Sequence, residues 1–318
     1  MRHFLFVDPI EKLNIKKDSS LMIGLSLKEL GHEVYLLFEK DFCVFTDGKM
    51  ELEVYPYTGN YKEDGFYLEK IQLGEKVQVT LNKSDTLHMR IDPPYDSRYQ
   101  RYLWMLDFMN TKLGVNVVNN PIGIMKHNEK LAAFKREKSL KSYIGSSESG
   151  FNRFVQKLKE NGVEELILKP LDLYSGIGVQ KVSIDAPNLL KLFNDKVQEF
   201  EGAIITQPFQ KEVYQGEIRS LYLDGVEIGS IIKKPVDGDF LTNIAQGAQF
   251  ESIKLPNDLK EECDLIAKEL QTDGVGFLAY DILAGAVTEV NVTCPGLLVE
   301  VSYAHKKNIA AIYANSFK

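Results

Sequence analysis

The chain of 318 residues has few cysteines, one tryptophan and no long hydrophobic run. Its cysteines, Cys43, Cys263 and Cys294, form no C-x-x-C pair, and their odd number cannot close a disulfide framework. No apolar stretch approaches the ~20 residues that span a bilayer. The first residues also lack the apolar core and small-residue cleavage site of a secretory signal. We therefore expect a cytoplasmic protein that makes no membrane contact.

Positive charge is also in short supply, with 38 Lys and Arg against 45 Asp and Glu and a net charge of −7. Dedicated nucleic-acid binders need clustered Lys and Arg to neutralise phosphates, so we expect no nucleic-acid partner. The 5 histidines are scattered without a Cys/His cluster, which argues against a zinc site. The hydrophobic fraction of 44% is that of an ordinary globular protein. At ~150 residues per domain, the length predicts about two domains.

Strand and helix patterns alternate in the N-terminal part, which is typical of an open parallel sheet. The expected strands are 3–7, 33–38, 87–91 and 115–118, and the expected helices are 21–30, 97–113 and about 121–134. Ser19 or Ser20 is expected to cap the first helix, and Gly31 suits the position after its end. Asp47-Gly48 is a strong hairpin dipeptide. Residues 62–84 are polar and have no clear pattern.

The remainder combines hairpins with occasional helices, which indicates α+β units. The expected helices are 186–200 and one capped around Ser146-Ser147, and the expected strands are 164–169, 179–182 and 203–209. One hairpin joins 217–223 to 226–233 through Asp224-Gly225, and another joins 276–283 to 286–293 through Ala284-Gly285. We place a domain boundary near residue 125, giving domains 1–124 and 125–318.

The second of these hairpins carries the clearest chemical signal. Glu289 and Asn291 lie two residues apart and share one face of a strand. A three-residue turn at 284–286 would bring Asp281 opposite Glu289. Carboxylate and amide oxygens suit Mg²⁺, which also takes waters and phosphate oxygens. The alternative is an acidic, solvated strand face.

Several basic residues could bind anions. Lys169 leaves an apolar strand beside a loop with Gly176 and Gly178, where its charge and the loop N–H groups could meet a phosphate. An ordinary strand-end lysine is the alternative. The segment 126–141 carries a net charge of +4, and Lys126 and Lys130 are expected on one helix face. Such runs are otherwise simply solvated.

Three further basic residues, Arg219, Lys233 and Arg90, are expected at positions where they could bind anions. Arg219 and Lys233 flank the first hairpin and could face one cleft. Arg90 lies at the C-terminal end of a predicted strand, where ligands of open α/β sheets bind. Its alternative is an ion pair with Asp92.

Together and in this order, these motifs resemble those of the bacterial glutathione synthetases of the ATP-grasp superfamily, over nearly the whole chain. The matching runs are Asp8-Pro9-Ile10 with 14–20, 89–94, Asn128-Glu129-Lys130, 167–172 and 288–293. The resemblance implies an ATP-grasp fold, in which an N-terminal open α/β domain is followed by two α+β lobes that enclose ATP. It implies an ATP-dependent ligase that joins γ-glutamylcysteine to glycine through an acyl phosphate.

The resemblance also implies a role for each matched residue. The nucleotide contacts would be Lys130 and Lys169 to phosphates, Gly176 in the covering loop, Gln207, Pro208 and Phe209 at the adenine, and Glu217 at the ribose. Asp281, Glu289 and Asn291 would hold two Mg²⁺ ions, with Mn²⁺ as an alternative metal. Arg219 and Asn243 would stabilise the transferring phosphoryl group. Lys16, Asp18, Ser19 and Arg90 would meet the peptide substrate, with Lys233 as a further anion contact. A homo-oligomer is implied as well.

The chain departs from the family pattern at four places. The family's Asp-Gly-x-Gly-Gly run reads here as Asp172-Leu173-Tyr174-Ser175-Gly176. Leu241 and Val299 stand near positions that are usually arginine, and Cys294 stands where serine is usual. These changes leave two alternatives open: a related ligase with a different acid or amine, and a non-catalytic ATP-binding scaffold.

Overall fold

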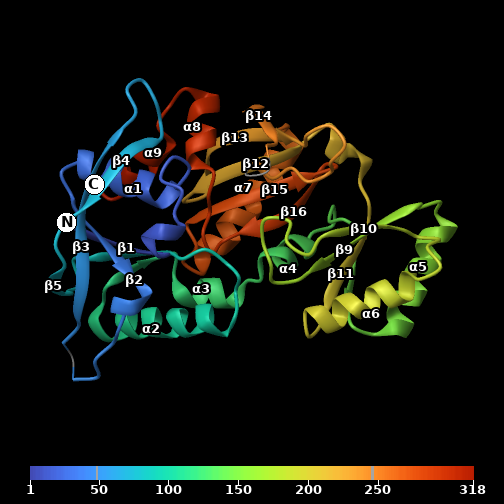
Figure 1. The fold of residues 1–318 in the computed structure, drawn as a ribbon, viewed down its shortest axis with the longest axis horizontal. Helices are drawn as coiled ribbons and strands as arrows, with labels where there is room; N and C mark the ends of the chain where they lie inside the picture. The colour runs from blue at the N-terminus through green and yellow to red at the C-terminus, as the bar shows by residue number, and fades with distance from the viewer. Residues whose placement is uncertain (48, 245–246) are drawn as a thin grey trace.

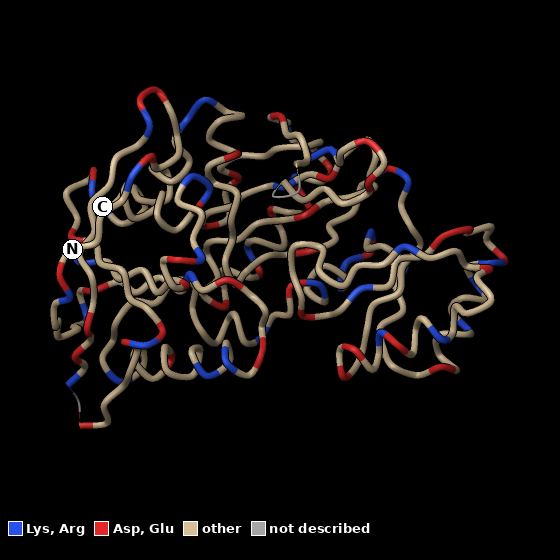
Figure 2. The backbone as a smooth tube through the Cα atoms, in the orientation of Figure 1, with Lys and Arg blue, Asp and Glu red and all other residues tan. Residues whose placement is uncertain are grey.

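The structure is a computed structural model that describes residues 1–47, 49–244 and 247–318. Figure 1 shows three parts in a row: an N-terminal domain, a central sheet and a small lobe at the opposite end. Both termini lie in the N-terminal domain. Acidic and basic residues are interleaved along all three parts (Figure 2).

The N-terminal domain is built on a seven-stranded sheet in the order β4-β3-β2-β1-β6-β7, with β5 paired to β3. Its strands are β1 (Arg2–Val7), β2 (Glu33–Phe38), β3 (Glu51–Tyr61), β4 (Leu68–Leu73), β5 (Val77–Thr80), β6 (Thr86–Arg90) and β7 (Asn116–Val118). Its helices are α1 (Ser19–Glu29), α2 (Ser97–Leu113) and α3 (Pro121–Lys126). Because β1 is parallel to both β2 and β6, the strand ends at Asp8 and Asp92 lie at the same edge.

Three local predictions in this domain need correction. Asp18, and not a serine, caps α1, because its Oδ1 accepts a hydrogen bond from the Leu21 N–H. The expected helix 121–134 is two helices, since α3 ends before His127 and Asn128 caps a new helix, α4 (Glu129–Phe134). Residues 42–46, before the expected Asp47-Gly48 turn, form no strand, and Gly48 itself lies outside the described residues. Gly31 follows the end of α1 as predicted, with φ of 85°.

The small lobe is a four-stranded sheet in the order β10-β9-β11-β8, covered by two helices. Its elements are β8 (Tyr143–Gly145), α5 (Glu148–Glu160), β9 (Glu165–Pro170), β10 (Gln180–Ser183), α6 (Leu189–Glu199) and β11 (Ile204–Pro208). Ser147 caps α5 as expected, accepting from the Gly150 N–H. The apolar faces of both helices meet the sheet around the stacked rings of Phe151 and Phe193, whose centroids are 4.1 Å apart.

The central part is a five-stranded sheet in the order β14-β13-β12-β15-β16, and it contains both predicted hairpins. Its elements are β12 (Glu217–Leu223), β13 (Val226–Lys234), β14 (Gln249–Ser252), α7 (Asn257–Thr272), β15 (Phe277–Leu283) and β16 (Ala286–Asn291). The chain then returns to the N-terminal domain through α8 (Leu298–His305) and α9 (Ile309–Asn315). One apolar core therefore joins α1 and the C-terminal helices to β12 and β13.

Candidate active site

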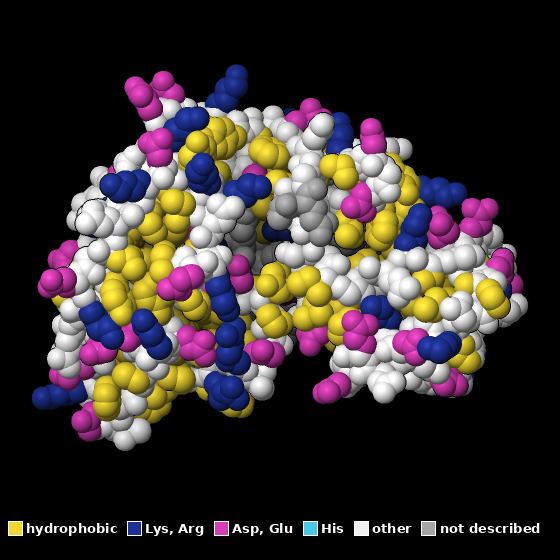
Figure 3. All heavy atoms as spheres, in the orientation of Figure 1, with side chains coloured by type: hydrophobic (Ala, Val, Ile, Leu, Met, Phe, Trp, Pro, Cys, Tyr) yellow, Lys and Arg dark blue, Asp and Glu magenta, His cyan; other side chains and the backbone are white. Residues whose placement is uncertain are grey.

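A cleft of about 440 Å³ lies between the small lobe and the central sheet. Strand ends of both lobes line it, and Asp92 and Pro93 of the N-terminal domain form part of its wall. The surface is hollowed between the small lobe and the rest of the molecule, and charges of both signs are interspersed on the same face (Figure 3). The predicted nucleotide and metal residues, with Arg219, Asn243 and Lys233, all line this one cleft.

Strand β16, which carries the predicted metal ligands Glu289 and Asn291 and is called the metal strand below, pairs with β15 in a hairpin with a bulge. Asp281 pairs with Glu289, as predicted, but Leu283 pairs with Ala286, so the turn is shorter than expected. Ala284 and Gly285 form this turn with φ of 52° and 76°. A register shift after Asp281 restores the Asp281–Glu289 pairing. The bulge therefore brings the two carboxylates to the same face of the sheet.

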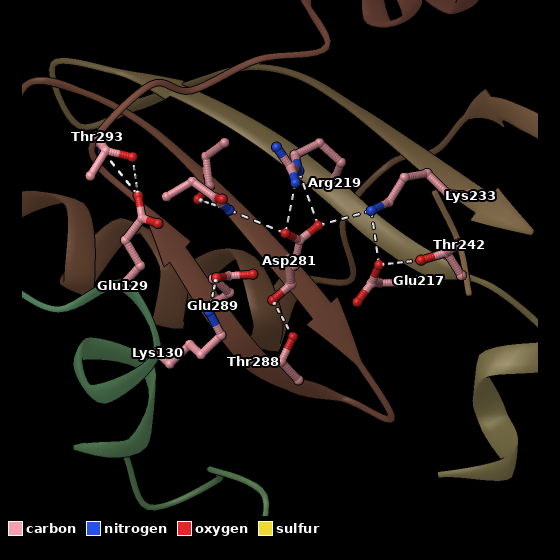
Figure 4. Close-up of polar contacts among 12 residues, drawn as sticks. Glu129, Lys130, Glu217, Arg219, Lys233, Thr242, Asp281, Thr288, Glu289 and Thr293 are labelled. Carbon is pink, nitrogen blue, oxygen red and sulfur yellow. Dashed lines mark hydrogen bonds and ion pairs between the residues drawn. The ribbon is translucent and has the colours of Figure 1, made fainter. Parts of the chain in front are cut away.

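Asp281 is the centre of a charged network (Figure 4). Arg219 donates to it through Nε at 3.0 Å and Nη2 at 2.7 Å, and Lys233 Nζ donates at 3.0 Å. Asn291 Nδ2 donates to Asp281 Oδ2 at 3.1 Å. Burial opposes ionisation, but Arg219 and Lys233 outweigh it and hold the pKa of Asp281 well below its usual value. The carboxylate is therefore ionised, and both of its oxygens accept hydrogen bonds from these three side chains.

Glu289 faces a different lysine. Lys130 Nζ lies 3.0 Å from Glu289 Oε1 and donates to the Leu173 carbonyl at 2.6 Å. Lys126 belongs to α3 and pairs with Asp273 at 2.8 Å, so it shares no helix face with Lys130. Of the two lysines, only Lys130 lines the cleft.

Glu129, which precedes Lys130, was not singled out in the sequence. Its Oε1 accepts from the N–H groups of Val292 and Thr293 at 2.8 and 3.0 Å and from Thr293 Oγ1 at 2.8 Å. Burial and the nearby Glu289 carboxylate raise the pKa of Glu129. The sequence offers no signal for these contacts beyond the place of Glu129 beside Lys130, because its partners follow 163 residues later.

Lys169 lies on β9, and its ammonium is 5.9 Å from the centre of the Phe134 ring. Burial lowers the pKa of Lys169 to about 8. The loop after β9 has left-handed backbone at Ser175, Gly176 and Gly178, with φ of 54°, 77° and 75°. Asn243 Nδ2 donates to the Ser175 carbonyl at 3.1 Å. This loop therefore contacts Lys130, which is expected to bind an ATP phosphate, and Asn243, which is expected to stabilise the transferring phosphoryl group.

The opposite end of the cleft is more apolar. Phe209 follows β11, and its N–H donates to the Glu165 carbonyl at 2.9 Å. Its ring lies 5.9 Å from that of Phe240 and 4.6 Å from Lys181 Nζ. Gln207 Nε2 donates to Ser142 Oγ at 2.8 Å. Pro208, between Gln207 and Phe209 in the chain, also lines the cleft. An aromatic side chain beside a strand edge can hold the flat base of a nucleotide.

Glu217 connects this end to the metal strand. Lys233 Nζ bridges Glu217 Oε2 at 2.8 Å and Asp281 Oδ1 at 3.0 Å, and Thr242 Oγ1 donates to Glu217. The side chains that the resemblance assigns to ribose and to metal are therefore joined through one lysine.

Of the residues predicted to meet the substrate, Lys233 lines the cleft, whereas Lys16, Asp18, Ser19 and Arg90 lie outside it. Lys16 is exposed, and its Nζ lies 5.9 Å from the Tyr67 ring centre. Ser19 Oγ accepts from the Leu298 N–H at 3.1 Å. Arg90 is 5% exposed and donates to Ser20 Oγ at 2.9 Å and to the Pro295 carbonyl at 2.8 Å. Burial raises the pKa of Asp18 to about 6.

The positions that depart from the family pattern differ in their surroundings. Leu241 packs over Gly176, with side-chain carbons 3.4 Å from where a Cβ would stand. Val299 is 4% exposed and belongs to the core that joins α8 to α1. Cys294 lines the cleft, and its Sγ lies 3.6 Å from the Arg90 carbonyl.

Comparison with known proteins decides the family of this site. The family model for the prokaryotic glutathione synthetase N-terminal domain matches residues 1–124, and the model for the ATP-grasp domain of the same enzymes matches residues 129–306. The chain belongs to the prokaryotic glutathione synthetase family. It is thus an ATP-dependent ligase that forms a peptide bond and uses Mg²⁺, as its family does.

Individual relatives agree with this assignment. The chain is 26% identical over 310 residues to glutathione synthetase of Parasynechococcus marenigrum, covering 98% of this chain and 96% of the relative. It is 28% identical over 305 residues to that of a Synechocystis strain, covering 95% and 94%. The described part of the chain contains no helix long and apolar enough to cross a membrane.

Solved structures confirm the predicted ATP-grasp fold. D-cycloserine synthetase DcsG superposes with a TM-score of 0.69 at 14% identity, over 99% of this chain and 100% of that one. D-alanine–D-alanine ligase from Bacillus anthracis, complexed with ATP, gives 0.58 at 14% identity, over 100% and 95%. At such low identity these likenesses concern the fold alone.

The donor set of the site fits Mg²⁺. Asp281 and Glu289 would contribute carboxylates and Asn291 an amide, all from the bulged hairpin. Residues 1–47, 49–244 and 247–318 contain no group of three or more His, Cys, Asp and Glu side chains that could hold a metal. A metal at this hairpin would therefore use two carboxylates and the amide oxygen of Asn291. Two carboxylates with one amide leave coordination positions for waters and phosphate oxygens, as Mg²⁺ requires.

Proposed function

We propose that this protein joins γ-glutamylcysteine, or a similar γ-glutamyl acid, to glycine. The supporting observation is that Lys130, Lys169, Arg219 and Lys233 converge with Asp281 and Glu289 in one cleft. Relatives that carry the name glutathione synthetase also match nearly the full length of the chain. Action in the cytoplasm and assembly as a homo-oligomer stay predictions.

The reaction needs charge neutralisation more than a nucleophile from the protein. A carboxylate oxygen of the acid attacks the γ-phosphorus of ATP, the bond to the β-phosphate oxygen breaks, and ADP leaves. The amine nitrogen of glycine then attacks the acyl carbon, inorganic phosphate leaves and the amine loses a proton. Asp281, Glu289 and Asn291 would hold Mg²⁺, which would supply Lewis-acid charge stabilisation.

The side chains of the cleft have separate tasks in this scheme. Lys130 and Lys169 bind phosphates, and Arg219 stabilises charge on the transferring phosphoryl group. Asn243, which lines the same cleft and donates to the Ser175 carbonyl, would stabilise the same group. In the cleft Lys130 is paired with Glu289 and Arg219 with Asp281. Exchange of these pairs for phosphates and Mg²⁺ keeps each charge partnered.

A second candidate is a related ligase with a different acid or amine. The observation that favours it is the apolar surface at Leu241 and Ile244, which line the cleft near Asn243. An aliphatic side chain cannot form the bidentate contact that arginine makes with a carboxylate.

The test is a phosphate-release assay with ATP, Mg²⁺ and a panel of γ-glutamyl and dipeptide acids, each with glycine and other small amines. We expect γ-glutamylcysteine to be turned over, and a better acid in the panel would favour the related ligase. Phosphate release with no acid, coupled to no amide, would contradict both. ATP binding without any turnover would identify a scaffold.

Leu241→Arg is the variant that tests the altered position. Replacing Val299 in the same way would bury a charge in the core, so it is unsuitable as a substrate probe. We expect Leu241→Arg to raise kcat/KM for γ-glutamylcysteine relative to acids with one carboxylate. An unchanged ratio would show that this position does not select the acid.

A further inference from the structure

Glu129 joins two segments of the site that lie far apart in the sequence. It is in the first turn of α4, immediately before Lys130. Its partners, Val292 and Thr293, immediately follow Asn291 at the end of β16. Figure 4 shows Glu129 and Lys130 on the helix facing the metal strand.

The contacts of Glu129 all converge on one oxygen. Two backbone N–H groups and the Thr293 hydroxyl donate to Oε1 at 2.8 to 3.0 Å. Hydrogen bonds to a carboxylate are stronger than those between neutral groups, and several donors on one oxygen allow little movement. The end of β16 therefore cannot slide along α4 while these bonds persist.

Both functional neighbours depend on this attachment. Lys130 reaches Glu289 Oε1 at 3.0 Å from the residue after Glu129. Asn291 reaches Asp281 Oδ2 at 3.1 Å from the residue before Val292. The Glu129 hydrogen bonds thus connect the helix that carries Lys130 to the strand that carries Asn291.

We propose that Glu129 is a positioning residue, which holds Lys130 at the correct distance from Asp281, Glu289 and Asn291 so that one nucleotide–metal unit contacts them all. This role rests on the proposed function. It requires an acceptor oxygen at the right reach, since the donors, two backbone N–H groups and the Thr293 hydroxyl, stay in any variant of Glu129. Loss of a group that orients metal or phosphate ligands typically costs about 10- to 100-fold in affinity or activity.

The test measures binding of a non-hydrolysable ATP analogue with Mg²⁺ by calorimetry, beside the thermal midpoint. We expect Glu129→Ala and the shorter Glu129→Asp to weaken binding by about 10- to 100-fold. Glu129→Gln keeps an acceptor at the same reach, and we expect it to recover most of the affinity. If Glu129→Ala does not fold, the comparison of analogue affinity between Glu129→Asp and Glu129→Gln decides.

Asp85 offers a matched control away from the cleft. It is 1% exposed and accepts from Arg2 at 2.8 and 2.6 Å and from the Asn82 N–H at 2.8 Å. Asp85→Asn should lower the thermal midpoint without changing analogue affinity. Wild-type affinity in Glu129→Asp, equal losses in the Gln and Asp variants, or an equal loss in Asp85→Asn would overturn the proposal. Failure of the wild type to bind the analogue would instead overturn the proposed function.

Discussion

The cleft and the N-terminal motif regions use their polar side chains in different ways. In the cleft, charged groups bond to one another, as Arg219 does to Asp281 and Lys130 to Glu289. In the N-terminal domain, the side chains of the matched motifs bond to the chain itself. Asp18 caps α1, Ser19 accepts from the Leu298 N–H, and Arg90 donates to the Pro295 carbonyl.

This difference affects what a ligand can displace. A charge pair in the cleft can be exchanged for a phosphate and a metal ion because each group gains a new partner. A helix cap is worth about 0.5–2 kcal/mol, which is lost when the cap turns toward a ligand. Matching motifs can thus mark ligand contacts in one region and architecture in another, and the following substitutions separate the two.

The largest effect is expected from Glu289→Gln. Loss of one metal carboxylate should cost several kcal/mol of transition-state stabilisation, or about 10² to 10⁴ in rate. The fold should persist, because Glu289 faces the cleft. Steady-state turnover at saturating Mg²⁺ is the measurement, with the exposed Glu251→Gln as control. Near-normal turnover would remove Glu289 from the metal site.

The next largest effect concerns the two cleft lysines. Lys130→Met and Lys169→Met should each weaken nucleotide binding by about tenfold or more, since each removes a charged phosphate contact worth roughly 1.5–3 kcal/mol. Calorimetry with an ATP analogue measures this. Lys234→Met is the control, because Lys234 is exposed and pairs with Glu251 at 2.7 Å. Unchanged affinity in both cleft variants would mean that neither lysine meets a phosphate.

A smaller effect follows from the pKa of Lys169, which burial lowers to about 8. Only the protonated ammonium attracts phosphate, so nucleotide affinity should fall as pH rises above 8, by at most about tenfold per pH unit. Lys169→Arg stays charged and should bind with little pH dependence up to pH 9.5. Parallel pH profiles for the two proteins would contradict the assignment.

The same shift affects stability with a definite sign. The folded-state pKa of Lys169 lies below the value of about 10.4 for a free lysine. Between these values the unfolded chain binds more protons, so this residue makes the folded state more stable as pH rises. We expect the free energy of unfolding of Lys169→Met to lack this rise with pH. Chemical denaturation of both proteins at pH 7.5 and 10 would measure it.

The smallest effect is expected from Asp18→Asn. Asparagine caps helices about as well as aspartate, so the stability should change by less than about 0.5 kcal/mol. If Asp18 also contacts the acid substrate, the KM of the Asp18→Asn variant for that acid should rise about three- to tenfold, which corresponds to the free energy of one hydrogen bond. Asp96→Asn is the matched control, because Asp96 caps α2 through the Tyr99 N–H at 2.8 Å. Equal KM values for both variants would make Asp18 a cap alone.

Local patterns determined most elements of this fold. The strand Glu33–Phe38 and the helix Ser97–Leu113 were predicted with their observed bounds, because hydrophobic period and turn residues act over a few neighbours. Both hairpins of the central sheet were predicted for the same reason. The break between α3 and α4 was missed, since Asn128 caps a helix inside a run that otherwise reads as helical.

The sequence by itself also determined that Glu289 and Asn291 share one face of a strand and that Asp281 lies on the other strand of the same hairpin, because alternation and turn residues act locally. Only the tertiary structure decided the rest. The bulge that sets the register of Asp281 and Glu289 lies within the hairpin. The pairing of Lys130 with Glu289 and the attachment of Glu129 to Val292 and Thr293 need the packing of α4 against β16. Such contacts join residues more than 150 positions apart, and their geometry depends on the summed packing of the layers between them and on no local pattern.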